Sequence, residues 1–270
     1  MQKTKNTLHV RRLWISAGIL CILSAISVFA GDKPVLSMII NYNPQWAESL
    51  PAKAIAQLGK AWIILWLVAV YVWRAGFTRH AAAALLSLVM ILAICSLFKV
   101  MVHRPRPETV ILGRTMEKSI TNNNCHSFPS GDTATAFAAA TVCVGLLSWP
   151  QLIIAFAASG YVGLHRMILI RHYFSDVLAG AAIGIACGIL AMEIVRQRLP
   201  EALFRKHVQT SRIIGLICAI VLIPLSCLET YRPLVKFLMV CGIPTAIIIV
   251  YDIIRKHSLA TKSQDIPGDK

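Results

Sequence analysis

The sequence predicts an all-α fold, a polytopic bundle of helices that crosses a membrane several times. Hydrophobic residues make up 57% of the 270-residue chain and charged residues only 14%, which is unusual for a soluble domain. The apolar residues gather in long runs, most of them long enough to cross a bilayer as a helix. Lysine and arginine mostly flank these runs, as they do in membrane proteins.

The hydrophobic runs predict a series of helical spans. In chain order they lie at about 13–30, 54–73, 81–98, 132–149, 151–165, 173–195, 211–228 and 235–254. The fourth and fifth share a stretch without charged residues, and Trp149-Pro150 lies near its middle, so we expect a tight turn between them. The fifth span is shorter than a full bilayer crossing.

The first span follows a basic N-terminal region and ends at Val28-Phe29-Ala30, which resembles a signal-peptidase site. An apolar run of about eighteen residues is more typical of a retained anchor. We therefore expect this helix to stay in the protein.

The basic residues also indicate the orientation of the chain. With the N-terminus in the cytoplasm, more of the lysines and arginines lie on the inner side, and most of the outer ones gather around two polar stretches. These stretches therefore face the non-cytoplasmic side. We expect an integral protein of a bacterial inner membrane with its functional site on the periplasmic side.

The net charge of +15 raises the question of the partner. Because the basic residues flank apolar segments and do not form one face, we expect membrane lipid headgroups as partners and no nucleic acid. The eight cysteines show no CxxC or paired histidine spacing, so their spacing does not favour a metal site. We expect no cofactor. Most of them fall in apolar runs and suit small hydrophobic roles; a disulfide between Cys125 and Cys227 stays open.

Three short polar stretches border apolar runs, where charged side chains are costly and need a reason. They are 99–107 (KVMVHRPRP), 129–132 (PSGD) and 166–176 (RMILIRHYFSD). In the third, His172 and Asp176 are four residues apart and share a helix face. The carboxylate can fix the imidazole tautomer and leave the other nitrogen as a nucleophile or base, although an ordinary ion pair at a helix start has the same spacing. Arg166 is suited to clamp an anion, and Arg171 points elsewhere, toward lipid headgroups.

The other two stretches have features of a phosphate site. Ser130 and Gly131 precede a span, where free N–H groups and the helix dipole favour an anion; Ser130 as a helix cap is the simpler alternative. Asp132 suits the first turn and becomes a proton donor only where its surroundings favour the protonated form. Lys99 and Arg106 add cations for the charge that spreads over phosphoryl oxygens. Contact with lipid phosphates at the interface is the alternative for Lys99.

In this order, Lys-x6-Arg-Pro, Pro-Ser-Gly and Arg-x5-His-x3-Asp resemble the three signatures of the type-two phosphatidic acid phosphatase superfamily, which includes the vanadium haloperoxidases. The motifs span 99–176, and the family's six-helix core corresponds to most of 13–198. The resemblance therefore implies a phosphatase-like membrane core at 1–198, followed at 199–270 by two additional transmembrane helices and a cytoplasmic tail.

The resemblance also implies roles for these residues. His172 attacks phosphorus and forms a phosphohistidine, oriented by Asp176. The phosphoryl oxygens are held by cations and a turn, namely Lys99, Arg106, Arg166 and Ser130-Gly131. Water then releases phosphate without a metal ion.

Two positions depart from the family pattern. The family usually has His after Pro-Ser-Gly, where it protonates the leaving oxygen, and this chain has Asp132. It usually has Ser before the third-motif Arg, and this chain has His165. Either Asp132 is the acid, or a nearby histidine is (His126, His103 or His165), or the leaving group needs little help, as with a pyrophosphate or an anomeric phosphate.

The sequence thus predicts a membrane lipid phosphatase whose partner is a phosphorylated lipid of the outer leaflet. Candidate substrates are undecaprenyl pyrophosphate, a lipid A phosphate, phosphatidylglycerophosphate and phosphatidate. Three alternatives remain: phosphotransfer to a second lipid, a non-catalytic lipid-anion binder or transporter, and a zinc site formed by His126, His165, His172 and Asp176, for which no tight ligand spacing argues. The sequence does not indicate the oligomeric state.

Overall fold

The computed structural model describes residues 2–42, 45–111, 126–201, 204 and 208–228. Within these residues the chain is helical and contains no β-strand, so the predicted all-α class is confirmed. The chain divides into two compact units, Met1–Leu216 and Ile217–Lys270, and the account below concerns the first. The predicted boundary between a core at 1–198 and an additional part at 199–270 stays a prediction.

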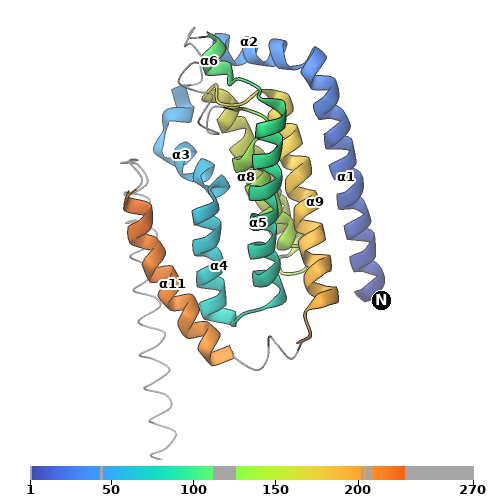
Figure 1. Ribbon diagram of the computed structural model, residues 1–270, viewed down its shortest axis with the longest axis vertical. Coiled ribbons are helices and arrows are strands. Elements are labelled where there is room, and N and C mark those ends of the chain that lie inside the picture. Colours follow the sequence, from blue (N-terminus) through green and yellow to red (C-terminus); the bar gives the residue numbers. More distant parts are fainter. Residues whose placement is uncertain (1, 43–44, 112–125, 202–203, 205–207, 229–270) are drawn as a thin grey trace, which may run out of the picture. The chain divides into compact units, whose positions relative to one another are not determined.

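Figure 1 shows the elements in order. The first part of the chain forms α1 (Gln2–Ala30), α2 (Asp32–Tyr42), the 3-10 helix η1 (Gln45–Glu48), α3 (Leu50–Ala56), the 3-10 helix η2 (Gln57–Gly59) and α4 (Ala61–Ala75). The rest forms α5 (Arg79–Val102), α6 (Pro107–Ile111), α7 (Gly131–Val142), α8 (Trp149–Ile168), α9 (Phe174–Arg198) and α11 (Val208–Leu228).

Each predicted span up to residue 228 falls on a helix, but two differ in detail. The span at 54–73 is broken, because Leu50–Gly59 and Ala61–Ala75 meet at 79°. The helix expected at 132–149 ends at Val142, and the turn after it contains Gly145 at φ 93, a conformation that favours glycine. The last predicted span, 235–254, lies outside the described residues.

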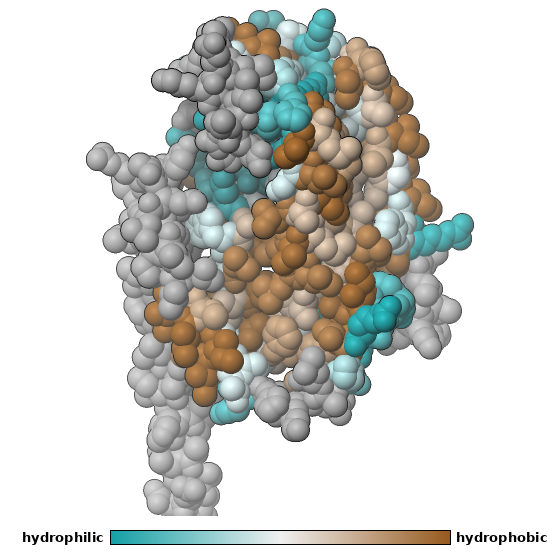
Figure 2. Space-filling view, in the orientation of Figure 1, coloured by the Kyte–Doolittle hydropathy of each residue, from teal (hydrophilic) through white to brown (hydrophobic). Residues whose placement is uncertain are grey.

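Three of the described helices are long and apolar enough to cross a membrane: Val10–Ala30, Arg79–Val102 and Phe174–Arg198. The bent pair of α3–η2 and α4 makes a fourth if it counts as one span. Large apolar side chains such as Val89 and Leu92 of α5 and Ile154 of α8 are more than 60% exposed. Hydrophobic residues also cover the middle of the face in Figure 2, whereas hydrophilic residues gather toward its top and in a smaller group at its lower right. Such a surface suits lipid contact.

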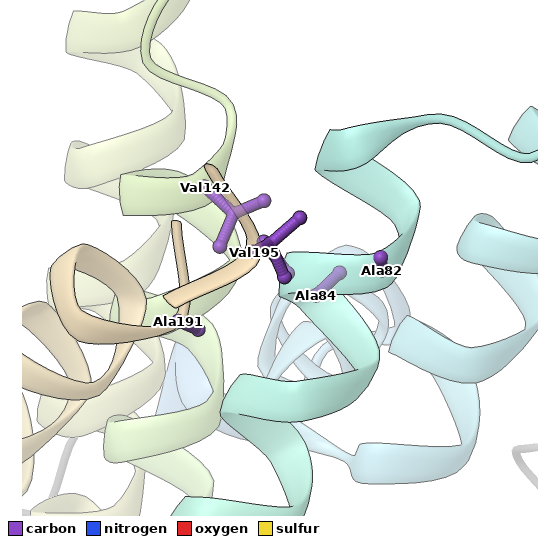
Figure 3. Packing of buried hydrophobic residues seen from close by; sticks show 6 residues of the cluster. Ala82, Ala84, Val142, Ala191 and Val195 are labelled. Atoms are coloured by element: carbon purple, nitrogen blue, oxygen red, sulfur yellow. The ribbon is translucent and has the colours of Figure 1, made fainter. Parts of the chain in front are cut away.

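Helix α9 is the centre of the bundle. In its most apolar window 61% of the residues are buried, against 39% for α5 and 17% for α1, and it packs against α1, α5 and α7. At one end of the bundle, small side chains of α5, α7 and α9 form a close-packed cluster (Figure 3): Ala82, Ala83, Ala84, Val142, Ala191 and Val195. Such small residues let helix backbones approach closely.

Glycines of α9 fix its register against α7. A Cβ at Gly180 would lie 2.5 Å from the carbonyl oxygen of Ser130, and one at Gly188 would lie 2.8 Å from the Thr141 side chain. Both contacts are far inside van der Waals range, so only glycine fits there. This close approach places the beginning of α7, with its Pro-Ser-Gly turn, beside the beginning of α9.

Candidate active site

Backbone hydrogen bonds join the three polar stretches in pairs. The N–H of Ser127, just before the second stretch, donates to the Arg104 carbonyl at 2.8 Å. The Ser130 N–H donates to the Asp176 carbonyl at 3.0 Å, and the Glu108 N–H, just after the first stretch, donates to the Ile170 carbonyl at 3.0 Å. Stretches that lie far apart in the sequence therefore meet at one end of the bundle, where α5 and α8 end and α7 and α9 begin.

His172 is buried and precedes α9. Its Nδ1 lies 2.7 Å from the Ser127 carbonyl oxygen and 3.8 Å from Oδ2 of Asp176. Because a carbonyl oxygen only accepts hydrogen bonds, Nδ1 carries the proton in this arrangement and Nε2 keeps its lone pair. The sequence predicted that Asp176 fixes the tautomer; in the structure the shorter contact is to a backbone carbonyl.

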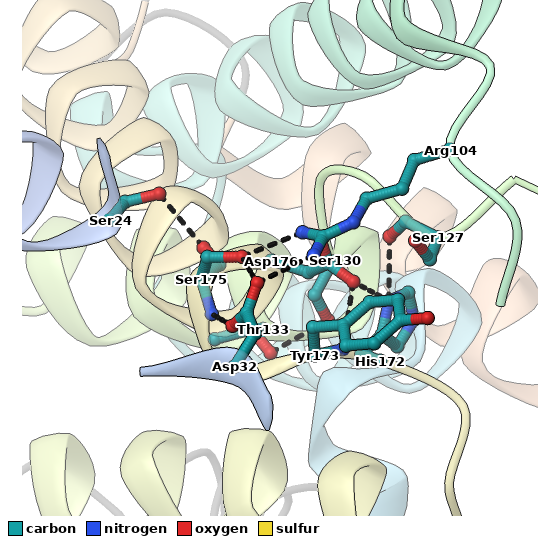
Figure 4. A network of polar contacts seen from close by, with 10 residues as sticks. All are labelled: Ser24, Asp32, Arg104, Ser127, Ser130, Thr133, His172, Tyr173, Ser175 and Asp176. Atoms are coloured by element: carbon teal, nitrogen blue, oxygen red, sulfur yellow. Dashed lines mark hydrogen bonds and ion pairs between the residues drawn. The ribbon is translucent and has the colours of Figure 1, made fainter. Parts of the chain in front are cut away.

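Asp176 is fully buried in the first turn of α9. Its Oδ2 accepts from the N–H of Tyr173 at 2.8 Å, which caps the beginning of the helix. Its Oδ1 accepts from Nη1 of Arg104 at 2.8 Å. Both carboxylate oxygens thus have strong partners other than His172, as Figure 4 shows.

Arg104 belongs to a buried network that sequence reasoning missed. Its Nη2 lies 2.5 Å from Oδ2 of Asp32, at the beginning of α2. Its Nη1 donates to the Ser175 hydroxyl at 2.7 Å, and its guanidinium lies over the Tyr173 ring, 3.9 Å from the centroid. The only sign of this network in the sequence was that Asp32 and Arg104 are charged residues beside apolar runs. Nothing in the sequence indicated that the two residues contact each other.

Asp132 lies among cations. Its Oδ2 is 2.8 Å from Nε of Arg166 and 3.6 Å from Nζ of Lys60. Two positive charges at this distance favour the ionised carboxylate, which has no proton to give. The geometry therefore does not support the predicted proton-donor role for Asp132. Lys60, which precedes α4, is a further residue at the site that sequence reasoning did not assign.

The remaining predicted cations lie in the same region. Lys99, in the last turn of α5, is within electrostatic range of Arg106, Asp132 and Lys60. His172 is within electrostatic range of Asp132. Lys99 and Arg166 therefore both lie near Asp132, Arg106 lies near Lys99, and His172 lies near Asp132. Positive charge gathered in this way favours an anion.

The beginning of α7 has the form of an anion cradle. Ser130 is fully buried, and its hydroxyl is bonded to Oγ1 of Thr133 at 2.8 Å. It makes no side-chain cap of the helix, so the simpler role as a cap is not realised. The Ala134 N–H bonds to the Ser130 carbonyl, which leaves the N–H groups of the first turn without an acceptor inside the helix. A Cβ at Gly131 would meet nothing within 4 Å, so there is open space beside it.

The histidines proposed as alternative acids lie in two places. His165 is buried, with Nε2 3.3 Å from the Ala47 carbonyl. The His126 ring lies 4.9 Å from that of His103. Burial, and next the charges of His103, Lys99 and Arg106, lower the pKa of His126. A neutral His126 is a poor acid near pH 7.

Comparison with known proteins confirms the predicted resemblance. Residues 80–200 match the PAP2 superfamily. Over 68 residues, 24% of this chain, the sequence is 43% identical to a lipid A 1-phosphatase of Porphyromonas gingivalis. The matched stretch spans only 15% of that protein.

Two solved structures resemble the fold. One is LpxE of Aquifex aeolicus, with a TM-score of 0.50 and 25% identity, covering 61% of this chain and 96% of that one. The other is a transmembrane PAP2-type phosphatidylglycerolphosphate phosphatase of Bacillus subtilis, with a TM-score of 0.51, 20% identity, and 71% and 98% coverage. The fold is thus that of a membrane helical bundle, and residues 80–200, which carry the three motifs, resemble the PAP2 superfamily. The proteins from Porphyromonas gingivalis and Bacillus subtilis are named as phosphatases.

Proposed function

We propose that this protein is an integral membrane lipid phosphatase that forms a phosphohistidine on His172. The observation that carries the proposal is the geometry of His172: Nδ1 donates to the Ser127 carbonyl at 2.7 Å, so Nε2 holds the lone pair. An imidazole held in this tautomer beside several cations is arranged for attack on a phosphoryl group.

The reaction has two displacements. Nε2 of His172 attacks phosphorus, the bond from phosphorus to the lipid oxygen breaks, and that oxygen leaves with the electron pair. A water molecule then attacks the phosphohistidine, the phosphorus–nitrogen bond breaks, and inorganic phosphate is released. Lys99, Arg106, Arg166 and the beginning of α7 stabilise charge on the non-bridging oxygens in both steps. The residues supply this charge without a metal, and we propose a metal-independent reaction.

The leaving group determines which substrates suit the site. Asp132 is flanked by Arg166 and Lys60, and burial and nearby cations lower the pKa of His126. Neither group is a good acid at neutral pH. We therefore propose a substrate whose leaving oxygen needs little protonation, such as a pyrophosphate or an anomeric phosphate. A lipid A phosphate is favoured among the candidates by the 43% identical stretch in the lipid A 1-phosphatase.

Charge placement supports the outer leaflet as the site of the reaction. The polar stretches hold positive charges that depart from the positive-inside bias of the other loops. We propose that the site faces the periplasmic side of a bacterial inner membrane.

The proposal is tested with protein purified in detergent and treated with chelator. A panel of lipid monophosphates and pyrophosphates is offered, and released phosphate is measured for the native chain and for His172→Ala. We expect release by the native chain, none above background for His172→Ala, and no effect of chelator. Full activity in His172→Ala would exclude the covalent route, and loss of activity on chelation would favour a metal.

A further inference from the structure

Asp32 and Arg104 lie outside every fixed position of the three motifs, and Asp32 also lies outside the matched residues 80–200. Asp32 is almost completely buried at the beginning of α2, directly after α1 ends at Ala30. The side chains come from parts of the chain about seventy residues apart. They meet beside the first turn of α9.

Asp32 holds the beginning of α9 through two contacts with Ser175 and makes a third contact with Arg104. Its Oδ1 accepts from the Ser175 N–H at 2.8 Å, and its Oδ2 accepts from the Ser175 hydroxyl at 2.6 Å. The same Oδ2 lies 2.5 Å from Nη2 of Arg104. From α1, the Ser24 hydroxyl donates to the Ser175 carbonyl at 2.9 Å. The bend between α1 and α2 is thereby fastened to the helix that carries Asp176.

Arg104 lies between two buried carboxylates. Nη2 contacts Asp32, and Nη1 contacts Oδ1 of Asp176 at 2.8 Å. The charges therefore alternate in a row, negative at Asp32, positive at Arg104 and negative at Asp176, and the row ends beside His172 (Figure 4). Buried ion pairs contribute little to stability compared with apolar packing. A row of this kind is better explained by what it does to the group at its end.

We propose that Asp32 and Arg104 are positioning residues for the reaction at His172, an inference that rests on the proposed function. Arg104 fixes the direction of the Asp176 carboxylate and offsets its negative charge. Asp32 fixes Arg104 and the first turn of α9. Together they set how strongly the protonated form of His172 is favoured.

The two residues therefore have opposite electrostatic effects. Arg104→Met leaves the charge of Asp176 unopposed, which favours the protonated imidazole. Asp32→Asn leaves Arg104 less neutralised, which favours the neutral imidazole. Because attack requires neutral His172, the acidic limb of the pH profile of kcat/KM moves to higher pH in the first variant and to lower pH in the second.

The other ionisable groups of the site are the same in both variants. From the neighbouring elements these are Asp132, Arg166, Lys60, Lys99, Arg106, His126 and Tyr173. If the acidic limb of the pH profile shifts in opposite directions in the two variants, the cause is therefore the row of charges formed by Asp32, Arg104 and Asp176. A general loosening of the fold would not move the two profiles in opposite directions.

The chain offers matched controls in the ion pair of Arg171 and Glu108, at 2.9 Å with side chains 43% and 28% exposed. Arg171→Met and Glu108→Gln make the same charge changes in a pair that solvent screens. We expect neither control to shift the acidic limb. Arg104→Lys keeps the positive charge, so its acidic limb should lie at the same pH as in the native chain. Its kcat should be lower, because lysine cannot contact Asp32 and Asp176 at once as the guanidinium does.

The experiment measures kcat, KM and the pH profile of phosphate release in detergent for all these variants. We expect kcat to fall about 10- to 100-fold in Arg104→Met and Asp32→Asn with little change in KM. The acidic limb of the pH profile of kcat/KM should shift by about half a pH unit, upward in Arg104→Met and downward in Asp32→Asn. Shifts in the same direction, or none in either variant, would overturn the inference.

A second readout does not need activity. In protein with ¹⁵N-labelled histidine, the His172 resonance is assigned with His172→Gln and titrated by NMR in the native chain and in each variant. The midpoints should move in the same opposite directions, and unmoved midpoints would overturn the inference. If the native chain releases no phosphate from any lipid, the proposed function fails, and the titration still decides whether Asp32 and Arg104 act on His172.

Discussion

His172 and Ser127 form the shortest contact at the nucleophile: Nδ1 lies 2.7 Å from the Ser127 carbonyl oxygen, whereas Asp176 is 3.8 Å from the same nitrogen. A backbone carbonyl is therefore sufficient to hold the tautomer that leaves Nε2 free. The carboxylate then acts mainly through its charge and through its bond to the Tyr173 N–H. This division of roles makes the first prediction.

Asp176→Asn should reduce activity less than His172→Ala does. The Asn side chain still offers an oxygen to the Tyr173 N–H, and the Ser127 carbonyl still orders the imidazole. We expect kcat to fall roughly 10- to 100-fold for Asp176→Asn, against loss to background for His172→Ala. The measurement is phosphate release with the best lipid of the panel. An equal loss of activity in the two variants would mean that Asp176, and not the Ser127 carbonyl, holds His172 in its reactive tautomer.

Asp132→Asn should tighten substrate binding. The Asp132 carboxylate forms ion pairs with Arg166 and Lys60. It therefore competes with the phosphoryl group of the substrate for these two cations. Removing its charge should lower KM by a few-fold and leave the basic limb of the pH profile in place, because an ionised carboxylate donates no proton. A variant that loses the basic limb would identify Asp132 as the proton donor.

Lys60→Met should weaken binding of the phosphorylated lipid. Lys60 adds positive charge to the site from outside the three motifs, and about a third of its side chain is exposed. We expect KM to rise about 3- to 10-fold with little change in kcat, and the effect should shrink at high salt. Lys33→Met is the control, since Lys33 is an exposed lysine on α2. The same rise in KM for both variants would mean that Lys60 acts only through net charge.

Gly180→Ala should destabilise the protein and impair activity together. A methyl group would lie 2.5 Å from the Ser130 carbonyl oxygen and push α7 away from α9, at a cost of about 1–3 kcal/mol in unfolding free energy. Gly160→Ala on α8 is the matched control, because nothing lies within 4 Å of its added Cβ; it should be neutral or slightly stabilising. Thermal unfolding in detergent measures both, and a stable Gly180→Ala would contradict the packing.

The sequence predicted the helices well because their signal is local. Long apolar runs mark α1, α5 and α9 directly, and the three motifs mark where the polar stretches meet. The break between α3 and α4 was missed because it depends on packing: a Cβ at Gly59 would lie 2.7 Å from the Asp132 carbonyl oxygen. No periodicity along 54–73 records such a contact.

The residues around the nucleophile were only partly predictable for the same reason. His172 and Asp176 are four residues apart, so helix spacing predicted that they would be close. They are close in the structure, but His172 lies just before α9 and not on the same helix. Asp32 and Arg104 approach Asp176 only because α2 and the segment after α5 meet at the beginning of α9. The carbonyl of Ser127 is not visible in a sequence at all, since every residue carries one.

The most direct test of the central claim is to trap the intermediate. The native protein is mixed with a lipid phosphate labelled with ³²P, quenched in base, where phosphohistidine is stable, and digested for mass spectrometry. We expect label and a phosphoryl mass increase on the peptide that contains His172, and neither in His172→Ala. Label on another residue, or rapid turnover with no labelled protein at any time point, would contradict a phosphohistidine at His172.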